Sequence, residues 1–219
     1  MARVALVGDS HAQVLWPALT ASLRAAGHTV VLSLAKPGWS EARYVKDGIA
    51  AKIRAASPDA VVFGLGGNNR ESGAAYSATV RALLSTPARV IWIGPAVATK
   101  EPFARYHAAT AALQAAVLPP LGVTWIDSAP YTRDGHRADG VHFTSYRAWA
   151  EGVTPDVLAA VVGASAGTPA RRSPAVLLPG VGPLRGGMVF AVGGVLLALL
   201  GLLRWRSRSV AAESSTPDR

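Results

Sequence analysis

The stretch RVALVGDSHAQVLWPALTASLRAAG, residues 3–27, decides the fold class of this chain. Residues 3–8 form a short apolar run that ends in a Gly-Asp-Ser turn, which is typical of a buried strand. Residues 13–26 have the apolar spacing of a helix, and Gly27 is a typical helix stop. The stretch therefore predicts a strand, a tight turn and a helix in succession.

The same alternation repeats to about residue 162. Further strands are predicted at residues 29–34, 59–63, 89–93 and 123–126. Further helices are predicted at residues 41–56, 71–84, 103–117 and 145–162. Apolar strands that alternate with helices form a parallel sheet covered on both faces, because each crossover helix lies on the sheet. We therefore expect a three-layer α/β/α sandwich with its functional site at the carboxyl ends of the strands.

The composition restricts the classes of protein and site that are possible. The 219 residues allow one α/β domain with an appendage, and the absence of cysteine excludes disulfides, thiolate metal sites and cysteine nucleophiles. The formal net charge is +9, but seven arginines against Glu213 and Asp218 give the part from residue 163 onward +5, which leaves +4 for residues 1–162. Because much of this excess flanks an apolar run, we expect membrane lipid rather than nucleic acid as a partner.

Three segments follow the predicted α/β domain at residues 1–162. Residues 163–185 contain Pro, Gly and Arg and are predicted to be a linker. Residues 186–203 carry no charge, and at about 1.5 Å per residue they would extend about 27 Å, close to the roughly 30 Å hydrocarbon core of a bilayer. A buried soluble helix is the alternative, but the flanking arginines and the polar basic tail at residues 204–219 favour a single-pass transmembrane anchor.

The flanking charges and the small residues of this predicted anchor bear on its orientation in the membrane and on its self-association. Three arginines lie on each side of it, so the positive-inside rule gives a tie. Residues 1–8 lack the long apolar core expected of a signal peptide, so we expect the α/β domain to face the cytoplasm, whereas a role in the cell envelope would demand the opposite topology. A stripe of small residues would let two copies of the helix pack closely, although the general abundance of Gly and Ala in this chain also accounts for it. The stripe consists of Gly187, Ala191, Gly194, Ala198 and Gly201.

Two polar clusters at opposite ends of the domain fit nucleophilic catalysis. Ser10 follows the first strand at the start of a helix, where backbone N–H groups favour developing negative charge, although a serine there is also a common helix cap. Asp139 precedes His142 by three residues, so the imidazole can face a serine while the carboxylate holds its other nitrogen. His28, His107 and His136 are expected to be surface or structural residues. His11 is expected to be a first-turn helix residue, with a substrate contact as the alternative.

Two glycine-containing loops supply candidate oxyanion donors. In the loop GLGGNN, residues 64–69, the amide of Asn68 can donate to an oxyanion. A phosphate-binding loop is the alternative there, but the GxGxxG spacing and the Walker lysine are missing. In KPGWS, residues 36–40, Gly38 offers a backbone N–H. Trp39, Phe103 and Tyr106 lie beside these loops, where they would line a substrate cleft or take part in ordinary packing.

Taken together, Ser10, Gly38, Asn68 and His142 occur in the order of the SGNH (GDSL-like) hydrolase family, which residues 3–160 resemble. The blocks that carry the resemblance are GDSH, GGNN and DGVHF. The resemblance implies a flavodoxin-like, five-stranded α/β sandwich. The sequence departs from the family pattern at His11, where the motif has Leu, and at Asn69, where the family usually has Asp.

The resemblance also implies a mechanism. Ser10 would attack an ester carbonyl, His142 would act as base and Asp139 would orient it, while the Ser10 and Gly38 amides and the Asn68 side chain stabilise the oxyanion. No metal and no organic cofactor are implied. The GDSH block resembles SGNH domains associated with acetylation of cell-surface sugars, which suggests a small acyl ester such as acetyl on carbohydrate as substrate.

Two other functions are compatible with the same sequence. One is a catalytically idle, membrane-tethered SGNH-like binding module. The other is a flavodoxin-like nucleotide or flavin binder that uses the loop at residues 64–69. The residues that recognise the substrate, and with them the acyl length and the alcohol, depend on loop conformations that the sequence pattern does not specify.

Overall fold

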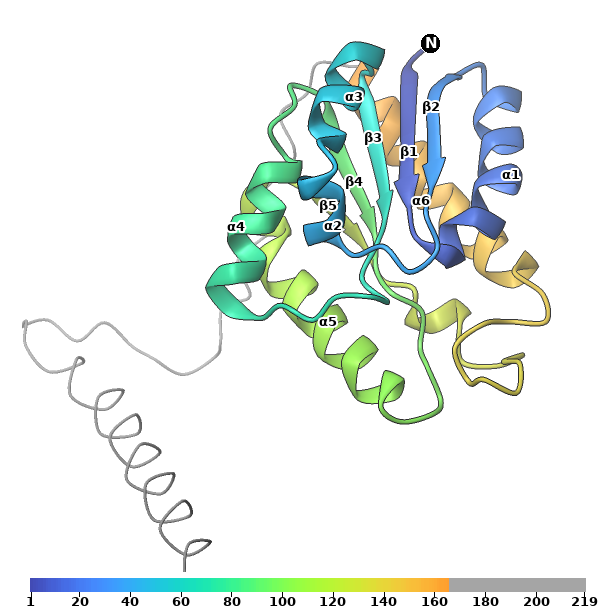
Figure 1. Ribbon diagram of the computed structural model, residues 1–219. Coiled ribbons are helices and arrows are strands. Elements are labelled where there is room, and N and C mark those ends of the chain that lie inside the picture. Colours follow the sequence, from blue (N-terminus) through green and yellow to red (C-terminus); the bar gives the residue numbers. More distant parts are fainter. Residues whose placement is uncertain (166–219) are drawn as a thin grey trace, which may run out of the picture. The chain divides into compact units, whose positions relative to one another are not determined.

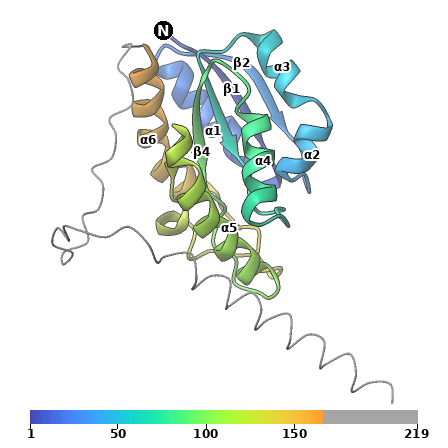
Figure 2. The same cartoon turned by 90° about the vertical axis from the view of Figure 1, so that its left-hand side faces the viewer.

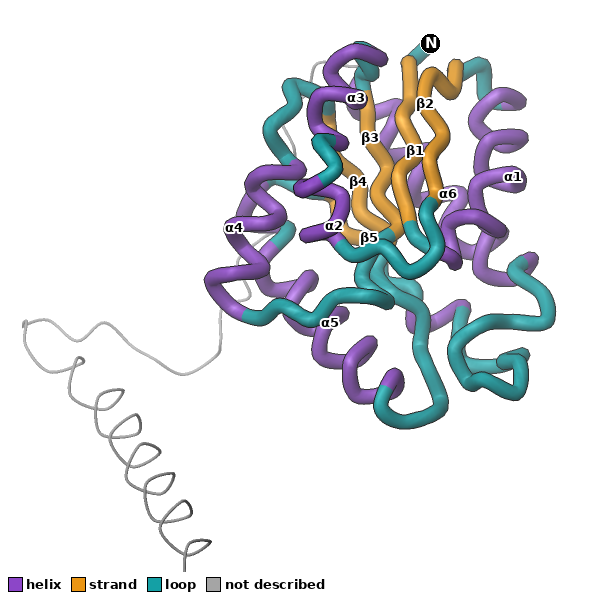
Figure 3. Tube along the Cα trace, in the orientation of Figure 1, coloured by secondary structure: helices purple, strands orange, loops and turns teal. Residues whose placement is uncertain are grey.

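The computed structural model of the chain describes residues 1–165, which form an α/β domain with a five-stranded sheet (Figures 1 and 3). Its strands are β1 (Arg3–Gly8), β2 (Thr29–Ala35), β3 (Ala60–Gly64), β4 (Arg89–Ile93) and β5 (Thr124–Ile126). All neighbouring strands pair in parallel, in the order β2-β1-β3-β4-β5. This is the flavodoxin-like strand order, and it confirms the predicted five-stranded parallel sheet.

Six α-helices connect or follow these strands within residues 1–165. They are α1 (Ser10–Ala25), α2 (Glu41–Lys46), α3 (Ile49–Ala56), α4 (Gly73–Leu83), α5 (Phe103–Val117) and α6 (Arg147–Ser165). The single helix predicted at residues 41–56 is wrong, because the structure divides it into α2 and α3. Gly48 between them has φ of 70°, a left-handed conformation that interrupts a helix and that glycine adopts without strain.

The helices cover both faces of the sheet, so the sheet is the middle of three layers (Figures 1 and 2). On β1, Val4 and Leu6 point into the core shared with α1 and α6. Their neighbours Ala5 and Val7 point into the opposite core, which α2, α3 and α4 cover. Because both faces of a central strand are buried, its sequence is continuously apolar rather than alternating.

The start of α1 depends on a close contact that only glycine permits. A Cβ atom at Gly8 would collide with the side chain of Ala12 and would lie 2.8 Å from the carbonyl oxygen of Gly64. Without that atom, α1 begins two residues after β1 and lies directly against the end of the sheet. This contact brings Ser10 to the carboxyl edge of the central strands.

The C-terminal end of the described region differs slightly from the predicted boundary. Helix α6 continues to Ser165, three residues into the segment predicted as linker, and the Arg89 guanidinium donates to the carbonyl oxygen of Gly163 at 2.8 Å. The rest of the linker, the predicted anchor with its small-residue stripe and the tail lie outside the described residues. Within residues 1–165 there is no helix whose length and hydropathy would let it cross a membrane.

A buried carboxyl group lies beneath the sheet on the α2–α4 side. Glu41 is fully buried, and its Oε1 accepts hydrogen bonds from the Tyr76 hydroxyl at 3.2 Å and the Gln114 amide at 3.4 Å. Its Oε2 has no hydrogen-bond partner among the described residues. Burial therefore raises the pKa of Glu41 to about 7.

This burial predicts a pH-dependent stability. The folded state binds the Glu41 proton more tightly than the unfolded chain, so the free energy of unfolding falls as the pH rises from 4.5 to about 7. Glu41→Gln keeps the acceptor oxygen and cannot ionise. We expect the free energy of unfolding of the variant, relative to that of the wild type, to rise by about 2–3 kcal/mol between pH 4.5 and 8. Urea unfolding at each pH measures this difference.

The exposed Glu101 offers a matched control, and Glu101→Gln should show no such gain. A Glu41→Gln variant whose stability parallels that of the wild type across this pH range would contradict the raised pKa.

Candidate active site

Ser10 is the first residue of α1, and the turn before it is held from several sides. The carboxylate of Asp9 caps the helix by accepting from the His11 backbone N–H at 3.0 Å. The carbonyl oxygen of Gly8 accepts from the Tyr44 hydroxyl at 2.6 Å and from the Lys36 backbone N–H at 2.9 Å. These bonds fix the direction in which the Ser10 side chain leaves the sheet.

The three predicted triad residues form a hydrogen-bonded series in which His142 lies between Ser10 and Asp139. The Ser10 Oγ is 3.2 Å from His142 Nε2, and His142 Nδ1 is 2.9 Å from Asp139 Oδ2. Ser10 and His142 are 132 positions apart in the chain, so the fold alone makes this contact. The arrangement matches a nucleophile, a base and an orienting carboxylate.

Backbone hydrogen bonds favour the ionised form of Asp139, whose side chain is half-exposed to solvent. Its Oδ1 accepts from the backbone N–H groups of Val141 and His142, both at 2.9 Å, and these bonds hold the pKa of Asp139 well below its ordinary value. The ionised Asp139 accepts a hydrogen bond from His142 Nδ1–H and so favours the tautomer that carries its proton on Nδ1. The Nε2 atom of this tautomer is then free to accept the Ser10 hydroxyl proton.

The two predicted oxyanion loops meet beside Ser10. Gly38 lies in a turn with φ of 73°, and the Asn68 amide donates to the carbonyl oxygen of Trp39 at 3.4 Å. The neighbouring Asn69 does not share this position. It is buried and closes its own loop by accepting from the Glu71 N–H at 3.0 Å and donating to the Glu71 carbonyl at 2.9 Å.

A cavity of about 360 Å³ joins these groups. It is lined by all five predicted site residues together with six others: Ser10, His11, Pro37, Gly38, Gly67, Asn68, Phe103, His107, Asp139, Val141 and His142. Phe103 lines the cavity, which agrees with the first of its two predicted roles, the lining of a substrate cleft. Trp39 and Tyr106 are not among the lining residues; cationic side chains lie over both rings instead.

Two further histidines line this cavity: sequence reasoning did not assign His107 to it, and it gave a substrate contact of His11 only as the alternative to a first-turn helix residue. His107 was expected to be surface or structural, but it is buried, lines the cavity and forms a 2.7 Å hydrogen bond from Nδ1 to the Ala96 carbonyl. His11, one position after Ser10, also lines it. The GDSH block was the only signal for His11, and nothing local distinguishes His107 from other helical histidines.

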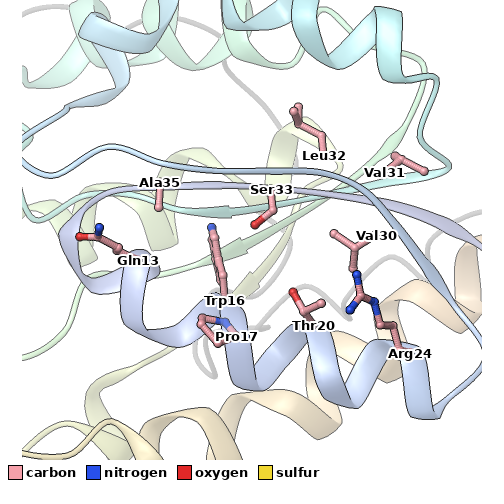
Figure 4. A pocket seen from close by; sticks show the side chains of 10 residues that line it. All are labelled: Gln13, Trp16, Pro17, Thr20, Arg24, Val30, Val31, Leu32, Ser33 and Ala35. Carbon is pink, nitrogen blue, oxygen red and sulfur yellow. The ribbon is translucent and has the colours of Figure 1, made fainter.

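A larger hollow of about 560 Å³ lies elsewhere, between α1 and the edge strand β2 (Figure 4). Trp16, Pro17 and Arg24 from α1 line it opposite Val30 to Ser33 of β2, and it contains none of the predicted catalytic residues. Across residues 1–165, no three His, Asp or Glu side chains are grouped so that they could hold a metal ion.

No family model and no curated protein matches the sequence. Solved structures do resemble it. A carbohydrate acetylesterase family member from Sinorhizobium meliloti is 19% identical, with a TM-score of 0.57 over 74% of this chain and 100% of that one. A carbohydrate esterase family 3 protein from Talaromyces cellulolyticus is 19% identical, with a TM-score of 0.56 over 74% and 99%. The M. smegmatis aryl esterase is 15% identical, with a TM-score of 0.55 over 73% and 99%.

These similarities cover about three quarters of this chain and nearly the whole of each solved chain. At such identities they establish the fold. The described part of this chain has the SGNH/GDSL hydrolase fold.

Proposed function

We propose that this chain is a serine ester hydrolase that removes a small acyl group, acetyl in the first instance, from a carbohydrate. The observation that carries the proposal is the hydrogen-bonded series Ser10, His142 and Asp139 at the wall of a cavity. A series of this kind activates a hydroxyl as a nucleophile. The same cavity contains the Gly38 and Asn68 donors that an ester oxyanion requires.

In the proposed reaction, Ser10 Oγ attacks the ester carbonyl while its proton passes to His142 Nε2. The carbonyl oxygen becomes an oxyanion, which the backbone N–H groups of Ser10 and Gly38 and the Asn68 amide stabilise. The tetrahedral intermediate collapses, the bond to the alcohol breaks, and His142 returns the proton to the departing oxygen. Water then attacks the acyl-serine with His142 again as base, which releases the acid and restores Ser10.

Two observations support a small acyl group on carbohydrate. The cavity volume of about 360 Å³ is at the low end of the range of small-molecule sites, roughly 300 to 1,000 Å³. Among the structures with this fold are a carbohydrate acetylesterase family member and a carbohydrate esterase. An idle binding module would not need the hydrogen bond between Ser10 and His142, which makes that alternative the weaker one.

Removal of either the nucleophile or the base tests the proposal directly. We expect Ser10→Ala and His142→Ala in the full-length chain to lower kcat for p-nitrophenyl acetate by about 10³-fold or more. The exposed Ser85 and the remote His28 supply controls, and their alanine variants should keep the wild-type rate. Folded wild-type protein without Ser10-dependent turnover of any short ester would favour the binding module.

Asp139→Asn tests the tautomer of His142. The asparagine amide would donate to Nδ1 and so favour the tautomer that carries its proton on Nε2. A protonated Nε2 cannot accept the Ser10 proton. We expect kcat at pH 7 to fall by about 10³- to 10⁴-fold with an unchanged melting temperature. A variant within tenfold of the wild type would show that Asp139 does not orient the base.

The two adjacent asparagines allow a matched test of the oxyanion donor. Asn68→Ala should lower kcat by about 10²- to 10³-fold and change KM little, because the lost hydrogen bond forms only as negative charge develops. Asn69→Ala should instead lower the melting temperature, since Asn69 holds its own loop. A rise in KM with unchanged kcat in Asn68→Ala would assign Asn68 to ground-state binding.

A further inference from the structure

The residue after the nucleophile lies at the centre of an aromatic cluster. The His11 ring is only 5% exposed. Its ring centre is 5.2 Å from that of His142, and the two rings are tilted by 33°. Four other rings surround it at centroid distances of 5.4 to 6.2 Å, those of Trp149, Tyr146, Phe143 and His107. His11 therefore joins the helix that carries Ser10 to the loop that carries His142.

A hydrogen bond adds direction to this packing. His11 Nδ1 is 3.1 Å from the hydroxyl oxygen of Tyr146, and both groups are buried. Tyr146 follows His142 by four residues, so the bond holds the C-terminal end of the segment 139–146, which carries Asp139 and His142. The N-terminal end is held from another side, where the Thr99 N–H donates to the Gly140 carbonyl at 2.8 Å.

The cluster is also fixed to the sheet. The Trp149 indole N–H donates to Ser128 Oγ at 3.1 Å, and Ser128 Oγ donates to the Gly94 carbonyl, just after β4, at 2.7 Å. A rigid support of this kind transmits the position of His11 to its neighbours. The His142 ring is thus held between Asp139 and a cluster that the sheet anchors.

Stability does not explain an imidazole at position 11. The His11 Nε2 atom is buried and has no hydrogen-bond partner among the described residues, which costs free energy. A leucine would fill these apolar surroundings without burying a polar nitrogen. Burial also lowers the pKa of His11 to about 3, so the ring stays neutral beside the imidazolium that His142 becomes during the reaction.

We propose that His11 is a positioning residue, which holds the His142 imidazole at hydrogen-bond distance from Ser10 through its bond to Tyr146 and its ring contact with His142. The inference rests on the proposed function. It predicts a loss of turnover without a loss of stability. His11→Leu and Tyr146→Phe in the full-length chain should each lower kcat for p-nitrophenyl acetate about 10- to 100-fold, because small displacements of a catalytic group cost that much.

Three further measurements separate positioning from a general structural role. The KM of both variants should stay within about twofold, and the melting temperature of His11→Leu should equal or exceed that of the wild type. The double variant should be no slower than His11→Leu alone, since both changes remove one hydrogen bond. His11→Asn, whose side chain places a polar atom near the position of Nδ1, should recover most of the lost kcat.

The remote His28 is the matched control. It is also buried, bonds through Nδ1 to the Ala2 backbone N–H at 3.2 Å and has an unpartnered Nε2, but it lies at the amino end of the sheet. His28→Leu should therefore leave kcat unchanged. Additive losses in the double variant, equal rates for His11→Asn and His11→Leu, or losses that follow the melting temperature would overturn the positioning role.

A second readout separates this inference from the proposed function. A fluorophosphonate probe forms a phosphorus–oxygen bond with Ser10 Oγ, releases fluoride and passes the serine proton to His142, so its labelling rate reports the Ser10–His142 contact without ester turnover. We expect His11→Leu and Tyr146→Phe to slow labelling as they slow kcat. Labelling of the wild type without ester hydrolysis would reject the proposed function alone. Unaltered labelling rates in both variants would reject the role of His11, and so would the absence of labelling in the wild type.

Discussion

The absence of a side chain at Gly8 is the constraint on which the site depends. It allows α1 to begin against the ends of β1 and β3, so that the first residue of the helix, Ser10, lies at the carboxyl edge of the sheet. Parallel strands deliver all of their following loops to that same edge. Gly38, Asn68 and His142 can therefore meet Ser10 although they come from loops that are far apart in the chain.

A comparison of three carboxyl groups shows how the surroundings of each one set its pKa. Asp9 and Glu41 are buried, and burial raises their pKa to about 6 and about 7. Asp139 is exposed, yet the backbone N–H groups of its own loop lower its pKa. Only Asp139 therefore combines a stable negative charge with a contact to the imidazole, which suits the orienting role proposed for it, while Asp9 acts as a helix cap.

The loop that carries His142 lies between β5 and α6, outside the strands of the sheet, and is held by contacts with other elements. The β4–α5 connection fixes its start through Thr99 and Gly140, and α1 contacts its end through His11 and Tyr146. The base is thus tied to the same helix that presents the nucleophile. Contacts from both the sheet side and α1 thus support the distance between Ser10 and His142.

The sequence by itself determined the alternation of strands and helices, the parallel sheet and the SGNH order of Ser10, Gly38, Asn68 and His142, because periodicity and short motifs are local. It did not indicate the break before α3 strongly enough, since one glycine at position 48 competes with a long helical pattern. The anchor predicted at residues 186–203 stays a prediction from sequence. Only the tertiary structure decided that His107 and His11 line the cavity and that His11 bonds Tyr146, because contacts between residues up to 135 positions apart have no local signature and form only when the sheet brings its loops to one edge.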